Sequence, residues 1–256
     1  MNSTIRSIRL AAAVALAAGT VVIVQTARPA GAGQKPAQFV SIFNGKDLSG
    51  WKIPEGDNGH WKVVDGVIDY DAMSEAKDKN LFTEKSYGDF TLKVDWRIKE
   101  TPYINPNVPI IKPDGTHKKG PDGKDVRMSV PDSDSGILFR NSNKAQVNIW
   151  CWPIGSGEVY GYRMDEKMPA SVRAGATPLK FADKNVGEWN TYEITVRGTR
   201  LTVLLNGVKV IDNADLPDLP ATGPVGLQHH GAKKGDTWTS PPALVQFRNI
   251  SIAELK

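Results

Sequence analysis

DSGILFRNSNKAQVNIWCW, residues 134–152, has the pattern of a β-hairpin. The pattern predicts strands at 135–140 and 145–150, joined by a turn at 141–144. Side chains alternate along the second strand, so one face is apolar and suited to a core while the other is polar. The polar face is predicted to carry Gln146, Asn148 and Trp150.

This polar face has the chemistry of a sugar-binding surface. Arg140 lies on the neighbouring strand and adds a guanidinium to the two amides. Amides and guanidinium match hydroxyl donors and acceptors, and an indole covers the apolar C–H face of a pyranose. We therefore interpret Arg140, Gln146, Asn148 and Trp150 as substrate-binding residues. The alternative is the ordinary solvated face of an antiparallel sheet.

Short strands separated by turn signals continue along the chain. FTLKVDWRIK, residues 90–99, alternates strictly, and Asp65-Gly66 and Asn206-Gly207 are the preferred turns of two hairpins. No stretch of useful length has a helical period. The sequence therefore predicts an all-β fold, a jelly-roll β-sandwich of two antiparallel sheets.

One segment, residues 100–132, breaks the strand pattern. It is dense in Pro, Gly, Asp and Lys and joins two predicted strands. A long loop of this kind is usually functional or mobile. We expect either a lid over the sheet or a plain surface insertion.

The N-terminus has the form of a signal peptide. Arg6 and Arg9 precede an apolar run, and Ala30-Gly31-Ala32 fits a cleavage site. The predicted organisation is a signal peptide at 1–32, a linker at 33–38 and a single domain at 39–256. We expect an exported protein, periplasmic or extracellular, with no stable membrane insertion after cleavage; an uncleaved anchor is the alternative.

Net charge and cysteine content limit the partners and the cross-links that this protein can have. The formal charge of +4 falls to +1 without residues 1–32, which hold three arginines and no acid, so nucleic acid is not an expected partner. Cys151 is the only cysteine, so no intrachain disulfide can form. Its strand parity predicts a buried, inert thiol.

The acids that could converge on a site from elsewhere in the chain are Asp95, Asp134, Glu158 and Glu193. The second hairpin strand has no carboxylate, which disfavours the paired carboxylates of ordinary glycosidases on that strand. His230 shares strand parity with Gln228 and is a candidate general base. Asp95 is a further candidate for substrate binding, with a surface ion pair as the alternative. No local metal motif occurs, so no cofactor is predicted and a divalent metal is left open.

An ordered set of motifs gives the chain a family resemblance. They include FVSIFNGKDLSGWK at 39–52, YGDFTLKVDWRIK at 87–99, GEWNTYEITVRGTRLTVLLNGVKV at 187–210 and GPVGLQHHG at 223–231. In this order they resemble the 3-keto-disaccharide hydrolase family over roughly 39–256. The resemblance implies a concanavalin-like lectin/glucanase sandwich that cleaves 3-keto-glycosides, with a small carbohydrate as substrate.

The ketone in such a substrate suggests a mechanism without a carboxylate pair. It acidifies the C2 proton, so a base can start a β-elimination. We expect His230 or Glu158 as the base, and Arg140, Gln146, Asn148 and Gln228 as oxygen-binding groups. Many members of the family have a motif that resembles Glu-Val-Gln-Ile at the position of Gln146. An amide at this position cannot act as an acid. A non-catalytic carbohydrate-binding module and a surface-interaction domain therefore remain as alternatives.

Overall fold

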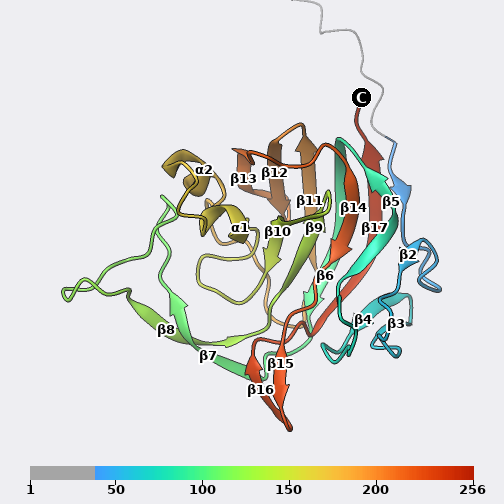
Figure 1. The fold of residues 1–256 in the computed structure, drawn as a ribbon, viewed down its shortest axis with the longest axis horizontal. Coiled ribbons are helices and arrows are strands. Elements are labelled where there is room, and N and C mark those ends of the chain that lie inside the picture. The colour runs from blue at the N-terminus through green and yellow to red at the C-terminus, as the bar shows by residue number, and fades with distance from the viewer. Residues whose placement is uncertain (1–37) are drawn as a thin grey trace, which may run out of the picture. The chain divides into compact units, whose positions relative to one another are not determined.

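Two antiparallel sheets pack face to face in the computed structural model, which describes residues 38–256 (Figure 1). The larger sheet has eight strands in the order β13-β12-β11-β6-β17-β4-β3, with β1 also paired to β17. Their bounds are β1 Val40–Ser41, β3 Trp61–Val64, β4 Val67–Tyr70, β6 Phe90–Ile98, β11 Asn190–Arg197, β12 Arg200–Leu205, β13 Val208–Asp215 and β17 Val245–Glu254. The predicted sandwich of antiparallel sheets is confirmed.

The smaller sheet carries the predicted hairpin. Its order is β10-β9-β14-β5-β2. The bounds are β2 Trp51–Lys52, β5 Leu81–Tyr87, β9 Ser135–Phe139, β10 Ser142–Ile149 and β14 Gly223–Leu227. Because β9 and β14 are central, their side chains lie in the middle of this sheet.

The core lies between the two sheets. Along β6 every second side chain is buried, from Phe90 through Trp96 to Ile98, as the alternation predicts. Val147 and Ile149 of β10 are fully buried in the same core. The outer face of the smaller sheet is therefore the polar one, and Gln146 and Asn148 lie on it.

The hairpin turn is shorter than the sequence suggested. Ser142 pairs with Phe139, so the turn consists of Arg140 and Asn141, with φ angles of 53° and 55°. The predicted turn at 141–144 was wrong because residues 142–144 already belong to β10, ahead of a register shift before Gln146. Asn tolerates this left-handed conformation, whereas Arg needs outside contacts to hold it.

The segment 100–132 is a long ordered hairpin. β7 Tyr103–Pro109 pairs with β8 Arg127–Asp132, and beyond them the isolated bridges Ile111–His117 and Lys119–Asp125 close two smaller turns, 112–116 and 120–124, which form the tip. The first of these turns approaches the two short helices, α1 Tyr160–Arg163 and α2 Ala170–Gly175, through Gly115 (Figure 1). This hairpin therefore extends from one end of the smaller sheet to the helices beside β10.

Two further observations complete the fold. A small hairpin, β15 Ala232–Lys234 with β16 Thr237–Ser240, follows β14. No helix within residues 38–256 is long and apolar enough to cross a bilayer. The predicted signal peptide lies outside the described residues.

Candidate active site

Five of the predicted site residues gather on or beside the outer face of the smaller sheet. Strand register places Gln146 opposite Leu138 and Asn148 opposite Gly136. The N–H of Gln228 donates to the carbonyl of Gly136, which brings β14 alongside. The gathered residues are Gln146, Asn148, Gln228, His230 and Glu158.

The three amides form one hydrogen-bonded cluster. Nε2 of Gln146 donates to Oδ1 of Asn148 and, at 2.7 Å, to Oε1 of Gln228. Both amide oxygens are thus occupied, and the NH₂ groups of Asn148 and Gln228 have no hydrogen-bond acceptor among residues 38–256. Two free donors side by side match the oxygens of a sugar.

A glycine makes room for this cluster. A Cβ on Gly136 would come within 2.6 Å of Nε2 of Gln146 and 2.7 Å of its Cγ. The Gln146 side chain therefore lies flat across β9, and any larger residue at 136 would push it away. A glutamate at 146 could not donate to both neighbours, so the amide at this position organises the cluster.

Asp134 and His230 lie beside the amides. Nε2 of His230 is 3.9 Å from Oδ2 of Asp134. Nδ1 of His230 is 2.6 Å from the carbonyl oxygen of Pro241. Because that carbonyl only accepts, Nδ1 carries the proton and Nε2 presents its lone pair next to Asp134.

The Asp134 carboxyl is poised to stay protonated near neutral pH. Burial raises the pKa of Asp134 from 3.8 to about 7, and the nearby Asp132 adds to the rise while His230 opposes it. Oδ1 of Asp134 is buried without a hydrogen-bond partner in the described chain. A carboxyl whose pKa lies near neutrality, 3.9 Å from an imidazole nitrogen, has the chemistry that proton transfer needs.

Glu158 lies at the edge of β10 but is not free. Its carbonyl accepts from the N–H of Asn148, which fixes it beside the amides. The carboxylate is fully buried, and Oε1 lies 2.6 Å from Nε of Arg163. Burial raises the pKa of Glu158 to about 7, Arg163 opposes this, and the charge of Asp134 adds to it. Glu158 therefore balances a buried cation and is a poor candidate for the base.

Arg163 also links the site to the long hairpin. Its Nη1 lies 3.2 Å from Nε2 of His117, whose Nδ1 lies 2.9 Å from Asp125. Both His117 and Asp125 belong to the segment between β7 and β8. A chain of polar contacts thus connects buried Glu158 with the tip of this hairpin.

Arg140 was wrongly predicted to bind substrate. Its guanidinium donates to the carbonyls of Gly88 and Gly198 and pairs with Asp89 at 2.7 Å. Only 1% of the residue is exposed. It also lies about 20 Å along β9 from Asp134, at the other end of the strand. Arg140 ties together the turns at that end of the sandwich.

Trp150 does not form an open platform. It is 2% exposed, stacks on Trp152 with ring centroids 4.0 Å apart, and donates its indole N–H to the carbonyl of Gly155. It also lines a separate pocket of about 240 Å³ together with Trp96 and Phe181. Because β10 ends at Ile149, strand parity no longer predicts the direction of the Trp150 side chain.

Asp95 lies in the other sheet. On β6 it accepts hydrogen bonds from Thr191 and Asn249, both at 2.7 Å, and lies 3.5 Å from Arg248. The alternative stated for Asp95, a surface ion pair, describes its surroundings better than substrate binding does. Its partner is Arg248 and not the neighbouring arginine of the same strand.

Two residues of the site had no role assigned from the sequence. Asp134 was only one of four acids that could converge on a site, and its position directly before β9, with the parity of the outer face, brings it to His230. Arg163 lies in a four-residue helix without any pattern that would have predicted its burial. Within residues 38–256, no three His, Cys, Asp or Glu side chains converge in a way that could hold a metal ion.

Solved structures with similar folds come from carbohydrate-active proteins. A protein from Parabacteroides distasonis, described as a candidate glycosyl hydrolase, is 20% identical, with a TM-score of 0.52 over 85% of this chain and 94% of its own. The carbohydrate-binding module CBM66 from Bacillus subtilis is 15% identical, with a TM-score of 0.39 over 80% and 96%. The alginate lyase AlyA1 from Zobellia galactanivorans is also 15% identical, with a TM-score of 0.41 over 78% and 83%.

A search of curated proteins found no match. The family comparison, in contrast, covers almost the entire described chain. Residues 38–253 match the family described as a 3-keto-alpha-glucoside-1,2-lyase-like domain. This match confirms the resemblance seen in the sequence motifs. The chain therefore belongs to the family of 3-keto-alpha-glucoside-1,2-lyase-like domains.

Proposed function

We propose that this protein is an exported enzyme that cleaves 3-keto-glucosides by β-elimination at the outer face of the smaller sheet. One observation carries the proposal: Nε2 of His230 lies 3.9 Å from the carboxyl of Asp134, whose pKa is raised by burial to about 7. The family description names the same class of substrate. Export rests on the signal-peptide pattern alone.

In this proposal His230 is the base. Its Nε2 removes the proton from C2, which the ketone at C3 makes acidic. The electrons of the C2–H bond form a C1=C2 double bond, and the bond between C1 and the leaving oxygen breaks. The products are an unsaturated keto sugar and an alcohol; later addition of water to the double bond would make the overall reaction a hydrolysis.

Asp134 is the acid that protonates the leaving oxygen. Its raised pKa keeps a proton available at neutral pH, and the departing alkoxide requires one. The free NH₂ groups of Asn148 and Gln228 would donate to the ketone oxygen or to a neighbouring hydroxyl. The amide at position 146 therefore suits binding and charge stabilisation, while proton transfer is done by the neighbouring pair.

An assay with matched substrates tests the proposal. Purified residues 33–256 would be incubated with a 3-keto-α-disaccharide and, separately, with the same disaccharide before oxidation, with and without divalent cations. We expect release of the leaving sugar from the keto substrate alone, because only the ketone acidifies C2. Cleavage of both substrates at similar rates would contradict elimination.

Substitutions locate the chemistry. His230→Ala and Asp134→Asn should each lower kcat by about 10²–10⁴-fold, the usual contribution of a positioned acid or base. Glu193→Gln, an exposed carboxylate on the larger sheet paired with Lys93, is the matched control and should leave kcat unchanged. Sugar binding by wild type without turnover of any keto substrate would select a non-catalytic carbohydrate-binding module instead.

A further inference from the structure

A second hollow lies on the same sheet face, outside the proton-transfer pair. It has a volume of about 850 Å³ and is lined by residues of β2, β5 and the turn between β9 and β10. The amides among its lining residues are Asn80, Asn141 and Asn143, and its aromatic residue is Phe82. Amides around one aromatic ring repeat the chemistry that a pyranose needs.

Strand register makes this hollow continuous with the amide cluster. Gln146 lies opposite Leu138, Leu138 opposite Gly226, and Gly226 opposite Phe82. A single row thus runs across four strands on one face, and its ends are about 14 Å apart at the usual strand spacing. Such a row is longer than one sugar ring.

Gly226 leaves room for an aromatic ring to lie flat on the sheet. A Cβ on Gly226 would collide with the ring of Phe82. The ring therefore lies down across β14, as the Gln146 side chain lies across β9 above Gly136. A ring that lies on the sheet can offer a flat face to the solvent, and Phe82 is partly exposed.

At Asn80, the hollow is also continuous with the candidate active site. Leu227 pairs with Leu81, so the next residues, Gln228 and Asn80, come side by side. Oδ1 of Asn80 accepts from the backbone N–H of His229 at 2.8 Å, which fixes the amide next to the His229-His230 segment. A ligand that contacts Gln228 would therefore reach Asn80 directly.

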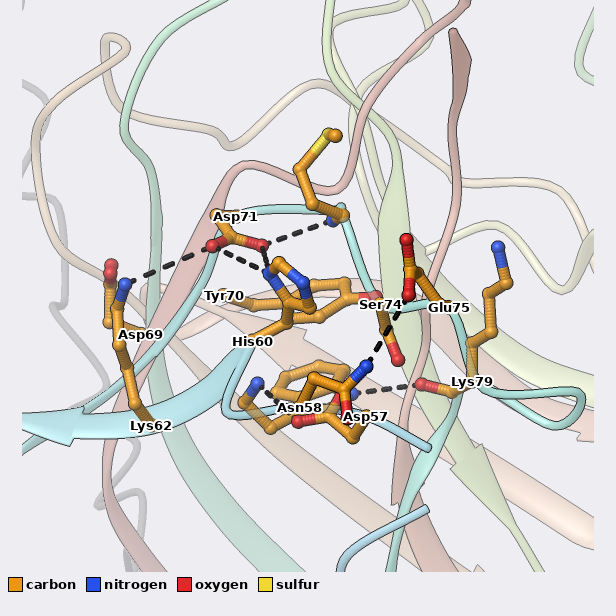
Figure 2. A network of polar contacts seen from close by, with 12 residues as sticks. Asp57, Asn58, His60, Lys62, Asp69, Tyr70, Asp71, Ser74, Glu75 and Lys79 are labelled. Atoms are coloured by element: carbon orange, nitrogen blue, oxygen red, sulfur yellow. Dashed lines mark hydrogen bonds and ion pairs between the residues drawn. The ribbon is translucent and has the colours of Figure 1, made fainter. Parts of the chain in front are cut away.

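The wall formed by residues 71–80 is held in place by polar contacts. Figure 2 shows the carboxylate of Asp71 beside the ring of His60, and Nδ1 of that ring lies 3.0 Å from Oδ1 of Asp71. The indole N–H of Trp61 donates to the carbonyl of Lys79 at 2.8 Å. A wall anchored at both ends needs little reordering when a ligand binds, which favours affinity.

The lining of the hollow has no net charge that would select a charged ligand. Two lysines and two acids line the hollow, so their formal charges cancel: Lys52, Lys77, Glu55 and Asp78. We propose that this hollow is a second subsite for a neutral sugar ring, and that the ligand is a chain of three or more sugars. This inference deepens the proposed function and rests on the same carbohydrate site.

Binding measurements test the subsite without requiring turnover. Calorimetry would compare gluco-oligosaccharides of two, three and four units, in α- and β-linked series, with wild type and Phe82→Ala. In wild type we expect about tenfold tighter binding on lengthening from two to four units, as one aromatic contact provides, and Phe82→Ala should lose this gain. Phe181→Ala, another exposed phenylalanine outside this face, should keep it.

Further variants separate a lost contact from a damaged fold. Phe82→Leu keeps apolar bulk but not the flat ring, and should also lose the gain. Asn143→Ala changes an exposed residue near the start of β10, ahead of its register shift, and should weaken binding of the longer chains alone. Affinity that is independent of chain length, a gain that survives Phe82→Ala, or no binding by any of these glycans would overturn the subsite. Binding that depends on chain length, without turnover of keto sugars, would contradict the proposed enzymatic activity but support the subsite.

Discussion

At the scale of single residues, the site depends on buried charges with defined neighbours. Glu158 and Arg163 are 0% and 1% exposed, so each needs the other to remain charged inside the protein. As the candidate base that the sequence suggested, Glu158 would be needed for turnover but not for the fold. The structure changes that expectation because the substitution leaves a buried guanidinium without its counter-charge.

We therefore predict that Glu158→Ala destabilises the protein. Removing one partner of a buried ion pair costs about 3–5 kcal/mol in the free energy of unfolding. Urea denaturation at pH 8 measures it, and Glu193→Gln, which breaks an exposed pair with Lys93, should cost at most about 1 kcal/mol. Recovery of stability in the double variant Glu158→Leu/Arg163→Met would support the cause, whereas equal losses for Glu158→Ala and Glu193→Gln would refute it.

A second residue-scale prediction concerns the contact of α1 with β10. A Cβ on Gly161 would lie 2.5 Å from the Cα of Lys144, which is backbone and cannot yield. Gly161→Ala should therefore lower the free energy of unfolding by about 1–3 kcal/mol, the usual cost of overpacking. Thermal unfolding followed by circular dichroism measures it.

The matched control for that substitution is Gly175→Ala in the other short helix. There the nearest atoms to a Cβ are 3.6 Å away, an ordinary contact, and alanine favours helix. Gly175→Ala should leave stability unchanged or raise it slightly. Similar losses in both variants would mean that the close approach to Lys144 is not the cause.

At the scale of elements, the hairpin of β7 and β8 matters most for the site. Composition indicated a loop at 100–132, but strand pairing and the contact between His117 and Arg163 order it. The rich content of Pro and Gly is compatible with a hairpin because the turns and register shifts use these residues. Local composition could not reveal that the partner of the tip is a helix about fifty residues further along the chain.

We predict that His117→Ala loosens the tip of this hairpin. The substitution removes both the contact to Arg163 and the contact to Asp125, while the paired strands β7 and β8 remain. Amide hydrogen exchange should show protection factors about tenfold lower within residues 110–126, and unchanged in β12 and β13. Lys119→Ala removes an exposed contact to the same Asp125 and should have little effect; equal loosening by both would contradict the role of Arg163.

At the scale of the whole molecule, the buried groups of the site make stability depend on pH. The folded-state pKa of Asp134 is raised from 3.8 to about 7 by burial. The folded state therefore holds a proton that the unfolded chain has released, and the stabilisation is complete below pH 4 and lost as pH rises through 7. The difference in unfolding free energy between wild type and Asp134→Asn should fall by at most about 4 kcal/mol between pH 4 and pH 8.

The stability that His229 contributes changes with pH in the opposite direction, so His229 serves as an internal comparison. Burial lowers the pKa of His229 from 6.5 to about 4, and its Nδ1 lies 2.7 Å from the hydroxyl of Tyr70. Its contribution is therefore complete above pH 6.5 and lost as pH falls to 4. The difference between wild type and His229→Gln should rise with pH over that window, and two differences of the same sign would contradict this assignment.

Sequence patterns alone predicted the sandwich, most strands and two of the hairpin turns, because alternation and Asn-Gly or Asp-Gly steps are local signals. They also put Gln146 and Asn148 on one face of the hairpin and gave Gln228 and His230 the same strand parity. Which charged groups lie around these residues depends on the tertiary structure. Arg140 turns away because its turn is held by carbonyls from distant loops, and Glu158 is neutralised by Arg163 of a short helix. Asp134 gains its acid character from burial by strands that follow it in the chain, and the desolvation that raises its pKa exists only once those strands are packed.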